Sequence, residues 1–448
     1  MTRERQPHLD TLIRKYSKNV PRYTSYPPVP SWTGAVDDRT WFTALGAYTK
    51  ANPQEGIAVY VHLPFCEQLC TYCACNKRIT VNHSVEGPYL NDIKREWERY
   101  LEALPPTFLL SELHLGGGTP TFFSAENLNA LMQILLAKAK LEPGASLSVE
   151  VHPNHTTREQ LEVLYAHGFR RISIGVQSLD LKVQVAINRV QPMSNVDTVA
   201  QTAREIGYTS INFDAIYGLP HQDLATVERD VQAIVASRPD RIAYYGYAHV
   251  PWKHAGQRRY TDHDLPSAEV RFASAQLARQ RFTDAGYIEI GFDHYALPSD
   301  TLALAAASGA LHRNFMGYTD RCNSVLIGLG SSSISETPFG YMQNDKHVET
   351  YRKRLDNQES LFVAGHQFTD EERATKQHIK NLMCRLETTI EGEYTPAMLD
   401  LADDGLVHLT GQHVEVQPHA RLFLRSVCAG LDPLEVHRAA TITYSSNL

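Results

Sequence analysis

The chain has 448 residues, of which 43 % are hydrophobic and 21 % are charged, and these fractions exclude a disordered or collagen-like protein. Its 43 basic and 50 acidic residues give a formal net charge of −7, which argues against nucleic acid or an anionic membrane as a partner. No apolar run approaches the ~18 residues that span a bilayer, and MTRERQPHLD at the start lacks the apolar core of a signal peptide. We therefore expect a cytoplasmic protein without a membrane span.

Residues 1–50 are predicted to form an N-terminal arm. The segment RYTSYPPVPSW at 22–32 is rich in proline and aromatic residues, which indicates irregular backbone. Residues 1–35 as a whole lack the periodicity of a packed helix or strand.

The chain between 57 and 286 alternates strand-like and helix-like patterns. The predicted strands are 57–64, the first part of 111–121, 146–153, 170–178, 210–220 and 241–250. The predicted helices are 86–104, 125–140, 157–168, 181–187, 195–206, 224–237 and 268–286. This alternation implies an α/β fold with right-handed crossovers, an open, partial (β/α)6 barrel of the TIM type. The strand-like segments 288–296 and 323–335 are expected to extend its edge, which gives a barrel domain over 51–340.

The pattern changes near residue 365. TDEERATKQHIKNLMCRL at 369–386 is an amphipathic helix that begins with an acidic cap, and 399–430 is predicted as helix, short hairpin and helix. We expect a small α-rich C-terminal domain over 365–448. A winged-helix arrangement would suggest DNA binding, but the segment is not basic, which favours a lid or packing domain.

Four of the seven cysteines lie within ten residues. They are Cys66, Cys70, Cys73 and Cys75. In a reducing compartment this clustering indicates a metal or redox centre. A structural zinc site would need a second ligand pair about 12–20 residues downstream, where only His83 follows, and a four-cysteine ferredoxin cluster uses other spacings. The C-x3-C-x2-C spacing, with Tyr72 before the third cysteine, suits three corners of a [4Fe–4S] cube and is typical of radical S-adenosylmethionine (SAM) enzymes.

Polar or small residues follow the ends of the predicted strands, where catalytic groups gather in parallel β/α folds. They are Gly116 to Pro120, Glu150, Gln177, Asp214, Ala248 and His249. Each alone is as easily a helix cap or a solvated residue. Together on one rim, they match the groups of SAM: Glu150 suits its ammonium or sulfonium charge, Arg189 its carboxylate and Asp214 its ribose hydroxyls.

These residues belong to longer motifs, and the chain resembles the oxygen-independent coproporphyrinogen III dehydrogenases, the radical SAM coproporphyrinogen oxidases of haem biosynthesis. The resemblance extends over nearly the whole chain. Its motifs are PRYTSYP (21–27), YVHLPFC-x3-C-x2-C-x-C-NK (60–77), LHLGGGTPT (113–121), SIGVQS (173–178), NFDAIYGLP (212–220), YAHVP (247–251), LHRNFMGYT (311–319) and RLFLRSVC (421–428).

The resemblance implies a [4Fe–4S] cluster bound by Cys66, Cys70 and Cys73, while Cys75 is needed for activity without being a ligand. It also implies two molecules of SAM, the second of which would contact Ile334. The remaining implied SAM contacts are Tyr60, Tyr72, Gly117, Gly118, Thr119, Glu150, Gln177, Arg189, Asp214 and Ala248.

The implied reaction converts two propionates of coproporphyrinogen III into vinyl groups, giving protoporphyrinogen IX, through a 5′-deoxyadenosyl radical. The implied partners are the tetrapyrrole, a reductant such as flavodoxin or ferredoxin and an unknown electron acceptor, with the protein a monomer. Arg22 and Tyr23 of the arm are expected to lie over the active site, as catalytic residues beside Cys75. Candidates to hold the propionates are Arg22, Lys253, Arg258, Arg259 and Arg313.

Two positions depart from the family pattern. Met316 replaces an expected Gln near the second SAM, and His152 replaces an expected Asp. Three other functions compete. A related haem chaperone carries the cluster loop, but it lacks the fourth cysteine and the RYTSYP segment. A radical SAM enzyme that methylates or opens a porphyrin would share the loop. An iron–sulfur sensor that binds DNA is opposed by the acidic charge.

Overall fold

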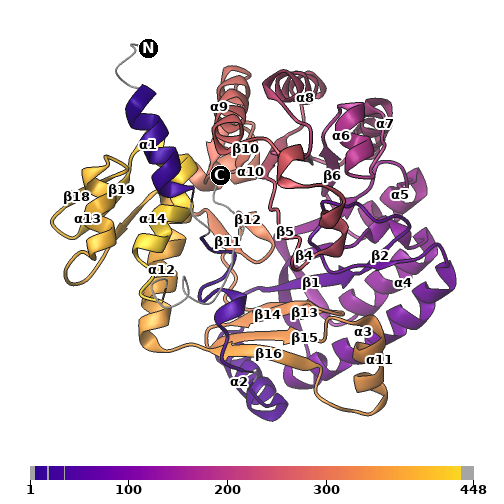
Figure 1. The fold of residues 1–448 in the computed structure, drawn as a ribbon. Helices are drawn as coiled ribbons and strands as arrows, with labels where there is room; N and C mark the ends of the chain where they lie inside the picture. The colour runs from indigo at the N-terminus through magenta and orange to yellow at the C-terminus, as the bar shows by residue number, and fades with distance from the viewer. Residues whose placement is uncertain (1–5, 18–19, 35, 435–448) are drawn as a thin grey trace.

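The computed structural model describes residues 6–17, 20–34 and 36–434, and it is built around one 12-stranded sheet (Figure 1). As predicted, six neighbouring strands run parallel in chain order. They are β1 (Ile57–Leu63), β4 (Phe108–Gly117), β5 (Ala139–Val151), β6 (Arg171–Gln177), β7 (Ser210–Tyr217) and β8 (Arg241–Gly246). Within the described ranges the two outermost strands of the sheet do not pair with each other, so the barrel is open.

The sheet is extended at both edges. Beyond β1, β13 (Leu326–Leu329) adds a parallel strand, and β14 (Ile334–Thr337), β15 (Gly340–Asn344) and β16 (Phe362–Gln367) follow antiparallel. Beyond β8 lie β10 (His294–Ala296) and β9 (Ile288–Ile290), also antiparallel. The segments 288–296 and 323–335 thus extend the sheet as expected. Each forms two strands where the sequence predicts one, and the first turns at Gly291 with φ +59°.

Helices cover the outer face of the parallel strands (Figure 1). They are α3 (Glu86–Ala103), α4 (Ala125–Leu136), α5 (Arg158–Ala166), α6 (Leu181–Ala186), α7 (Met193–Ile206), α8 (Leu224–Ser237) and α9 (Ala268–Asp284). The predicted helix over 125–140 is shorter than expected, because the chain already enters β5 at Ala139. The remaining connecting elements are β2 (Phe65–Cys66), β3 (Arg78–Ile79), α10 (Thr301–Ala307), β11 (His312–Asn314), β12 (Gly317–Thr319) and α11 (Val348–Asp356).

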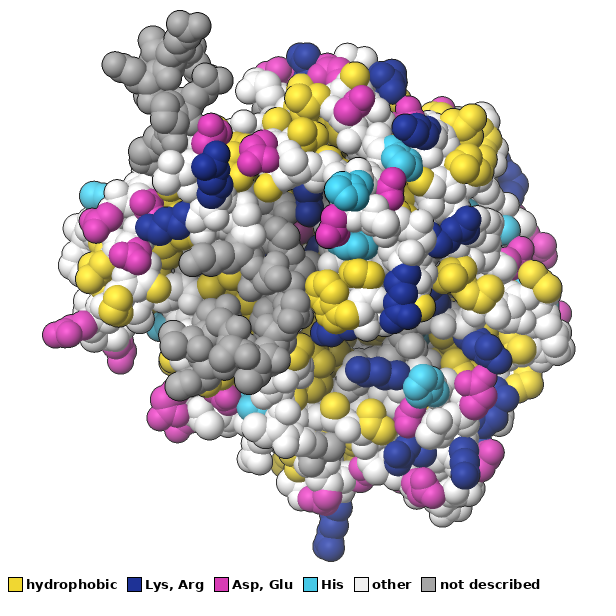
Figure 2. All heavy atoms as spheres, in the orientation of Figure 1, with side chains coloured by type: hydrophobic (Ala, Val, Ile, Leu, Met, Phe, Trp, Pro, Cys, Tyr) yellow, Lys and Arg dark blue, Asp and Glu magenta, His cyan; other side chains and the backbone are white. Residues whose placement is uncertain are grey.

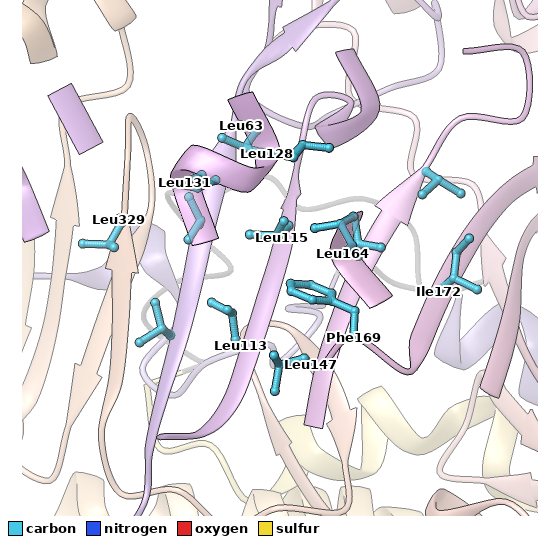
Figure 3. Close-up of a cluster of buried hydrophobic side chains, with 14 of the residues drawn as sticks. Leu63, Leu113, Leu115, Leu128, Leu131, Leu147, Leu164, Phe169, Ile172 and Leu329 are labelled. Atoms are coloured by element: carbon cyan, nitrogen blue, oxygen red, sulfur yellow. The ribbon is translucent and has the colours of Figure 1, made fainter. Parts of the chain in front are cut away.

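Side chains alternate along the strands, so the outer face of the sheet is apolar and the face toward the barrel interior is polar. Leu113 and Leu115 of β4 point to the helix layer, where Leu128 of α4 and Leu164 of α5 are fully buried with them (Figure 3). Burying each such leucine stabilises the fold by about 1.5–3 kcal/mol. His114, which lies between the two leucines, faces the barrel interior. The strands therefore deliver polar groups to a lumen whose outer wall is held by apolar packing.

The prediction of an irregular arm over residues 1–50 is wrong for two segments, which form the helices α1 (Gln6–Tyr16) and α2 (Asp38–Ala51). The side chain of Asp37 caps α2 by accepting from the backbone N–H of Thr40 at 3.0 Å. Between the helices, residues 20–28 are irregular, as the prolines predict. Residues 1–5, 18–19 and 35 of the predicted arm lie outside the described part of the chain.

The N-terminal segment packs against the C-terminal unit, as the indigo and yellow ribbons show (Figure 1). Leu12 and Ile13 of α1 are buried in one core with α12 (Asp370–Arg385), α13 (Pro396–Asp403) and α14 (Leu424–Gly430). Arg425 donates from Nε to the carbonyl oxygen of Pro21 at 3.1 Å, and from Nη2 to that of Val20.

The C-terminal unit contains more strand than its predicted α-rich character suggests. Besides its helices it has a three-stranded sheet of β17 (Glu387–Thr389), β19 (His413–Val416) and β18 (Val407–Thr410). Residues 435–448 of the predicted domain lie outside the described ranges. Of the helices described, none is long and apolar enough to cross a membrane. On the face shown in Figure 2, Lys and Arg are interspersed with Asp and Glu and form no single basic surface.

Candidate active site

A cavity of about 460 Å³ lies at the C-terminal ends of the parallel strands and reaches into the barrel interior. It brings together most of the residues predicted from the sequence. Those that line it are Arg22, Cys66, Cys70, Tyr72, Cys73, Cys75, Gly117, Gly118, Thr119, Glu150, Gln177, Arg189, Asp214 and Ala248. Residues from the N-terminal segment, the cysteine loop and five strand ends therefore share one space.

Backbone hydrogen bonds hold the cysteine loop in place over the strand ends. The N–H of Thr71 donates to the carbonyl oxygen of Ile187 at 2.9 Å, which joins the loop to the end of α6. The side chain of Gln257 donates to the carbonyl oxygen of Tyr72 at 2.8 Å. These contacts fix the loop from two sides, so its thiols are positioned by the barrel.

The three predicted cluster ligands are free thiols on the cavity wall. Thr119 donates its hydroxyl to the Sγ of Cys66 at 3.4 Å, and Arg189 donates to the Sγ of Cys70 at 3.8 Å. Such donors stabilise thiolates, the form that binds iron. Within the described ranges no group of His, Cys, Asp and Glu is arranged to hold a single metal ion. Three free thiols of one loop on one cavity wall are the donor chemistry that a [4Fe–4S] cluster takes.

The electrostatics of the loop differ between its cysteines. Burial raises the pKa of Cys66 to about 11. The hydrogen bond from the Cys75 thiol lowers the pKa of Cys73 to about 6, and the same contact raises the pKa of Cys75. Lys77 donates to the carbonyl oxygen of Cys73 at 2.9 Å and adds positive charge beside the thiols. Cys75 therefore contacts Cys73, one of the predicted cluster ligands, directly.

The glycine turn after β4 lies against the cysteine loop so closely that a side chain does not fit. A Cβ atom on Gly118 would lie 2.5 Å from the carbonyl oxygen of Pro64. Next to this turn, Glu150 accepts from the N–H of Gly117 at 3.2 Å, and His114 Nε2 lies 3.3 Å from its other oxygen. The Glu150 carboxylate is thus oriented toward the turn before any ligand binds.

Asp214 and Arg189 are also held by neighbours within the barrel. Asp214 accepts from the hydroxyl of Ser173 at 2.5 Å and from the side-chain amide of Asn212 at 2.8 Å. Burial raises the pKa of Asp214, and these two hydrogen bonds oppose that rise. Arg189 donates to the carbonyl oxygen of Gly175 at 2.8 Å. A carboxylate and a guanidinium are therefore preorganised on adjacent parts of the wall.

Three predicted residues are not on the wall of this cavity. Tyr60 lies behind it, with its ring stacked on His114 at 5.9 Å between centroids. Tyr23 is buried in the C-terminal core and donates its hydroxyl to Asp432 at 3.1 Å. Ile334 lies in β14, outside the set of parallel strands. Tyr23 and Tyr60 are thus placed to position neighbours of the site.

The candidate propionate cations fall into two groups. Arg22 lines the main cavity and donates to the carbonyl oxygen of Gly246 at 2.8 Å, and Arg313 lines a smaller cavity beside it. The other three belong to neither wall. They are Lys253, Arg258 and Arg259. The structure therefore brings two of the five predicted cations to the site.

The two positions that depart from the family pattern both line the main cavity. The N–H of Met316 donates to the side-chain oxygen of Asn314 at 2.8 Å, so its backbone is fixed. Burial, followed by the charge of Arg189, lowers the pKa of His152 well below its usual range. His152 is therefore neutral at this wall, where the expected Asp would be charged.

The smaller cavity, of about 160 Å³, contains groups that are not among the residues predicted from the sequence. They are Arg271, Arg425, Asp293 and His294. Nothing local in the sequence marks Arg271, one of several arginines of α9. Asp293 and His294 fall in the segment 288–296, for which the sequence predicts a strand and nothing more. Arg425 does lie in the motif RLFLRSVC, but the motif alone does not indicate what this arginine does.

Comparisons with known proteins agree with this geometry. The family model described as the Radical SAM superfamily matches residues 60–234. The oxygen-independent coproporphyrinogen III oxidase of Pseudomonas aeruginosa is 36 % identical over 437 residues, which is 94 % of this chain and 95 % of that protein. The protein of the same name from Escherichia coli K12 is 35 % identical over 438 residues, with 94 % of each chain covered.

A solved structure extends the likeness to the fold. Coproporphyrinogen III oxidase (HemN) from Escherichia coli, described as a radical SAM enzyme, superimposes with a TM-score of 0.87 at 33 % identity. The match covers 92 % of this chain and 97 % of that one. The chain therefore belongs to the family of oxygen-independent coproporphyrinogen III oxidases.

Proposed function

We propose that this protein carries out the anaerobic oxidative decarboxylation of coproporphyrinogen III to protoporphyrinogen IX in haem biosynthesis. One observation carries the proposal: the free thiols of the C-x3-C-x2-C loop, the polar strand ends and a set of arginines line continuous space. The family relationship over nearly the full length supports the same reaction.

The cofactor side of the site would bind a [4Fe–4S] cluster and SAM. When bound, these groups would supply a 5′-deoxyadenosyl radical that removes a hydrogen atom from the β-carbon of a propionate. Cys66, Cys70 and Cys73 would hold the cluster. Glu150 and Arg189 suit the ammonium and carboxylate of SAM, and Asp214 suits its ribose hydroxyls. Because their neighbours already fix these side chains, little reorganisation is required on binding.

The substrate side must accept an anionic tetrapyrrole and keep water away from the reacting carbon. Arg22 lies on the cavity wall within the N-terminal segment, where it can pair with a carboxylate while that segment limits solvent access. After hydrogen removal, loss of CO₂ and of one electron to an acceptor converts the propionate into a vinyl group. Two of the four propionates react in this way.

Four finer points are part of the proposal. The site would bind a second SAM near Met316, with Ile334 as a contact. The reductant would be a small redox protein such as flavodoxin or ferredoxin. The protein would act as a monomer in the cytoplasm. The electron acceptor is left unspecified.

An anaerobic assay of the reconstituted protein with SAM, a reductant and coproporphyrinogen III tests the function. We expect protoporphyrinogen IX, CO₂ and 5′-deoxyadenosine, and no product from Cys66→Ser. Cys322→Ser is the matched control, since Cys322 is exposed and lines neither cavity. Tight tetrapyrrole binding without any conversion by the wild type would instead favour the haem chaperone alternative.

A further inference from the structure

Four guanidinium groups surround the smaller cavity, which we call the arginine pocket. They belong to Arg22, Arg271, Arg313 and Arg425. The arginine pocket adjoins the main cavity, and both are lined by Arg22, Tyr245, Gly246, His294 and Met316. A ligand in the main cavity can therefore extend one arm into the arginine pocket.

The wall of the arginine pocket carries more guanidinium groups than carboxylates. Asp293 is the acidic residue on its wall, and it already lies 2.5 Å from Nδ1 of His294. In the part of the chain that the structure describes, Arg22, Arg271 and Arg313 donate to backbone carbonyl oxygens and form no ion pair with a carboxylate. An anion bound between them would relieve their mutual repulsion.

Burial and like charge together act on these arginines. Burial, with the charges of Arg22 and Arg271 acting in the same direction, lowers the pKa of Arg425 to about 9. The pKa values of Arg22 and Arg271 are also lowered, first by desolvation, and each feels a neighbouring guanidinium, although the charge of Asp293 opposes the shift of Arg22. Arginine side chains nevertheless stay charged in proteins. The protein thus holds several cations close together at a cost in stability.

The orientation of the guanidinium groups is fixed, although their hydrogen bonding is incomplete. Arg271 donates to the carbonyl oxygen of Tyr247 at 2.7 Å, and Arg313 donates to that of Tyr23 at 2.6 Å. Within the described residues, the buried Nε atoms of both arginines have no hydrogen-bond partner. Gly218 makes room for Arg271, since a Cβ there would lie 2.8 Å from its Nε. Fixed forks with unused donors suit a planar carboxylate.

We propose that the arginine pocket binds one carboxylate of the substrate, a propionate arm that is not the one reacting, with Arg271 and Arg313 as specificity-determining contacts. The proposal rests on the proposed function. A volume of about 160 Å³ is below the ~300–1,000 Å³ typical of pockets for whole small molecules, so it suits a side arm. The carboxylate of a second SAM has the same chemistry and is the other possible source.

Steady-state kinetics of the reconstituted holoenzyme separate these sources. For Arg271→Gln and Arg313→Gln we expect the KM for coproporphyrinogen III to rise about tenfold or more, with kcat changed less than about threefold. SAM affinity and reductive SAM cleavage without substrate are expected to stay at wild-type values. Arg271→Lys, which keeps the charge and loses the fork, should fall between Arg271→Gln and the wild type.

The matched control is Arg281→Gln, on the same helix α9, where Arg281 pairs with Glu228 at 2.8 Å away from both cavities. Its KM should equal that of the wild type. If one glutamine variant fails to fold, the other and Arg271→Lys still report on the pocket. Because relief of repulsion offsets lost contacts, the folded variants should melt within a few degrees of the wild type.

Three results would overturn the proposal. An unchanged KM in both folded glutamine variants would remove the arginine pocket from substrate binding. A loss of SAM affinity with an unchanged substrate KM would assign it to the carboxylate of SAM. A wild type that converts no coproporphyrinogen III would refute the proposed function itself. The first two outcomes leave the proposed function intact and refute only the role of the arginine pocket.

Discussion

The two sides of the active-site cavity are built in opposite ways. On the cofactor side, three thiols come from one loop of ten residues, and the polar groups around them follow successive strands of one sheet. On the arginine side, the four cations come from the N-terminal segment, α9, β11 and α14, which are far apart in the sequence. The cofactor side is therefore set by local motifs and sheet register, and the arginine side by tertiary packing.

This contrast has an energetic basis. The polar strand ends inherit their positions from the hydrogen-bonded ladders between β4, β5, β6 and β7, which the buried leucine layer stabilises. The arginine side depends on contacts between the two ends of the chain. We expect damage to the first side to abolish cofactor chemistry, and damage to the second to uncouple it from the substrate.

Loss of a cluster ligand should have the largest effect on turnover. In Cys66→Ser, Cys70→Ser and Cys73→Ser we expect no activity, and iron content and visible absorption near zero, because a serine hydroxyl is a poor iron ligand. Cys75→Ser should keep its iron and lose activity. Iron analysis of all four variants checks this. Loss of the cluster from Cys75→Ser as complete as from Cys66→Ser would indicate four thiolate ligands.

Deletion of residues 1–30 should have the next largest effect on turnover. It removes Arg22 from the wall and Leu12 and Ile13 from the C-terminal core, where burial of each contributes about 1.5–3 kcal/mol. We expect the truncated protein to keep its cluster and to cleave SAM, while product formed per SAM cleaved falls at least about tenfold. Leu12→Ala is the control that loosens α1 and retains Arg22. Full coupling in the truncated protein would reduce the segment to a tether.

Asp214→Ala should weaken SAM binding with little effect on stability. The lost charged hydrogen bonds correspond to about 1.5–3 kcal/mol, or roughly a tenfold to hundredfold rise in the Kd of SAM. Asp230→Ala is the matched control, because Asp230 is also buried and accepts from Ser178 at 2.6 Å, but it lies outside the cavity. It should lower the melting temperature and leave the Kd unchanged. The reverse pattern would make Asp214 structural.

Glu96→Gln should leave turnover unchanged and alter only the pH dependence of stability. Glu96 accepts from the N–H of Gly330 at 2.7 Å and from the hydroxyl of Tyr351 at 2.6 Å, so long-range polar contacts also occur outside the arginine side. Burial raises the pKa of Glu96 from 4.5 to about 7. Its contribution is fully present below pH 4.5 and is lost as pH rises to about 7, because the unfolded chain ionises first.

The expected loss is about 3 kcal/mol in the free energy of unfolding across that pH window. Urea unfolding of the cluster-free chain at a series of pH values measures it. Since the glutamine is neutral throughout, the variant should lack this part of the slope. Equal slopes for Glu96→Gln and the wild type would show that folding does not raise the pKa of Glu96.

The sequence predicts which residues of the cofactor side meet in one cavity, because this information is local. Alternation in the strands places Glu150 and Asp214 at one rim, and the cysteine spacing fixes the loop chemistry. The sequence predicts α1 poorly, because a short helix with few apolar residues depends on a partner that lies near the opposite end of the chain. The arginine pocket also depends on tertiary contacts, since Arg271 differs from the other arginines of α9 only in what the fold places beside it.

The bonds from Arg425 to the carbonyl oxygens of Val20 and Pro21 set an order of events during biosynthesis. The ribosome releases the N-terminal segment first, yet its partner Arg425 lies 404 residues after Pro21. The parallel strands and the cysteine loop are complete long before that residue emerges. Iron and sulfide can therefore reach the nascent site while one of its walls is still missing, and that wall closes only after Arg425 has emerged.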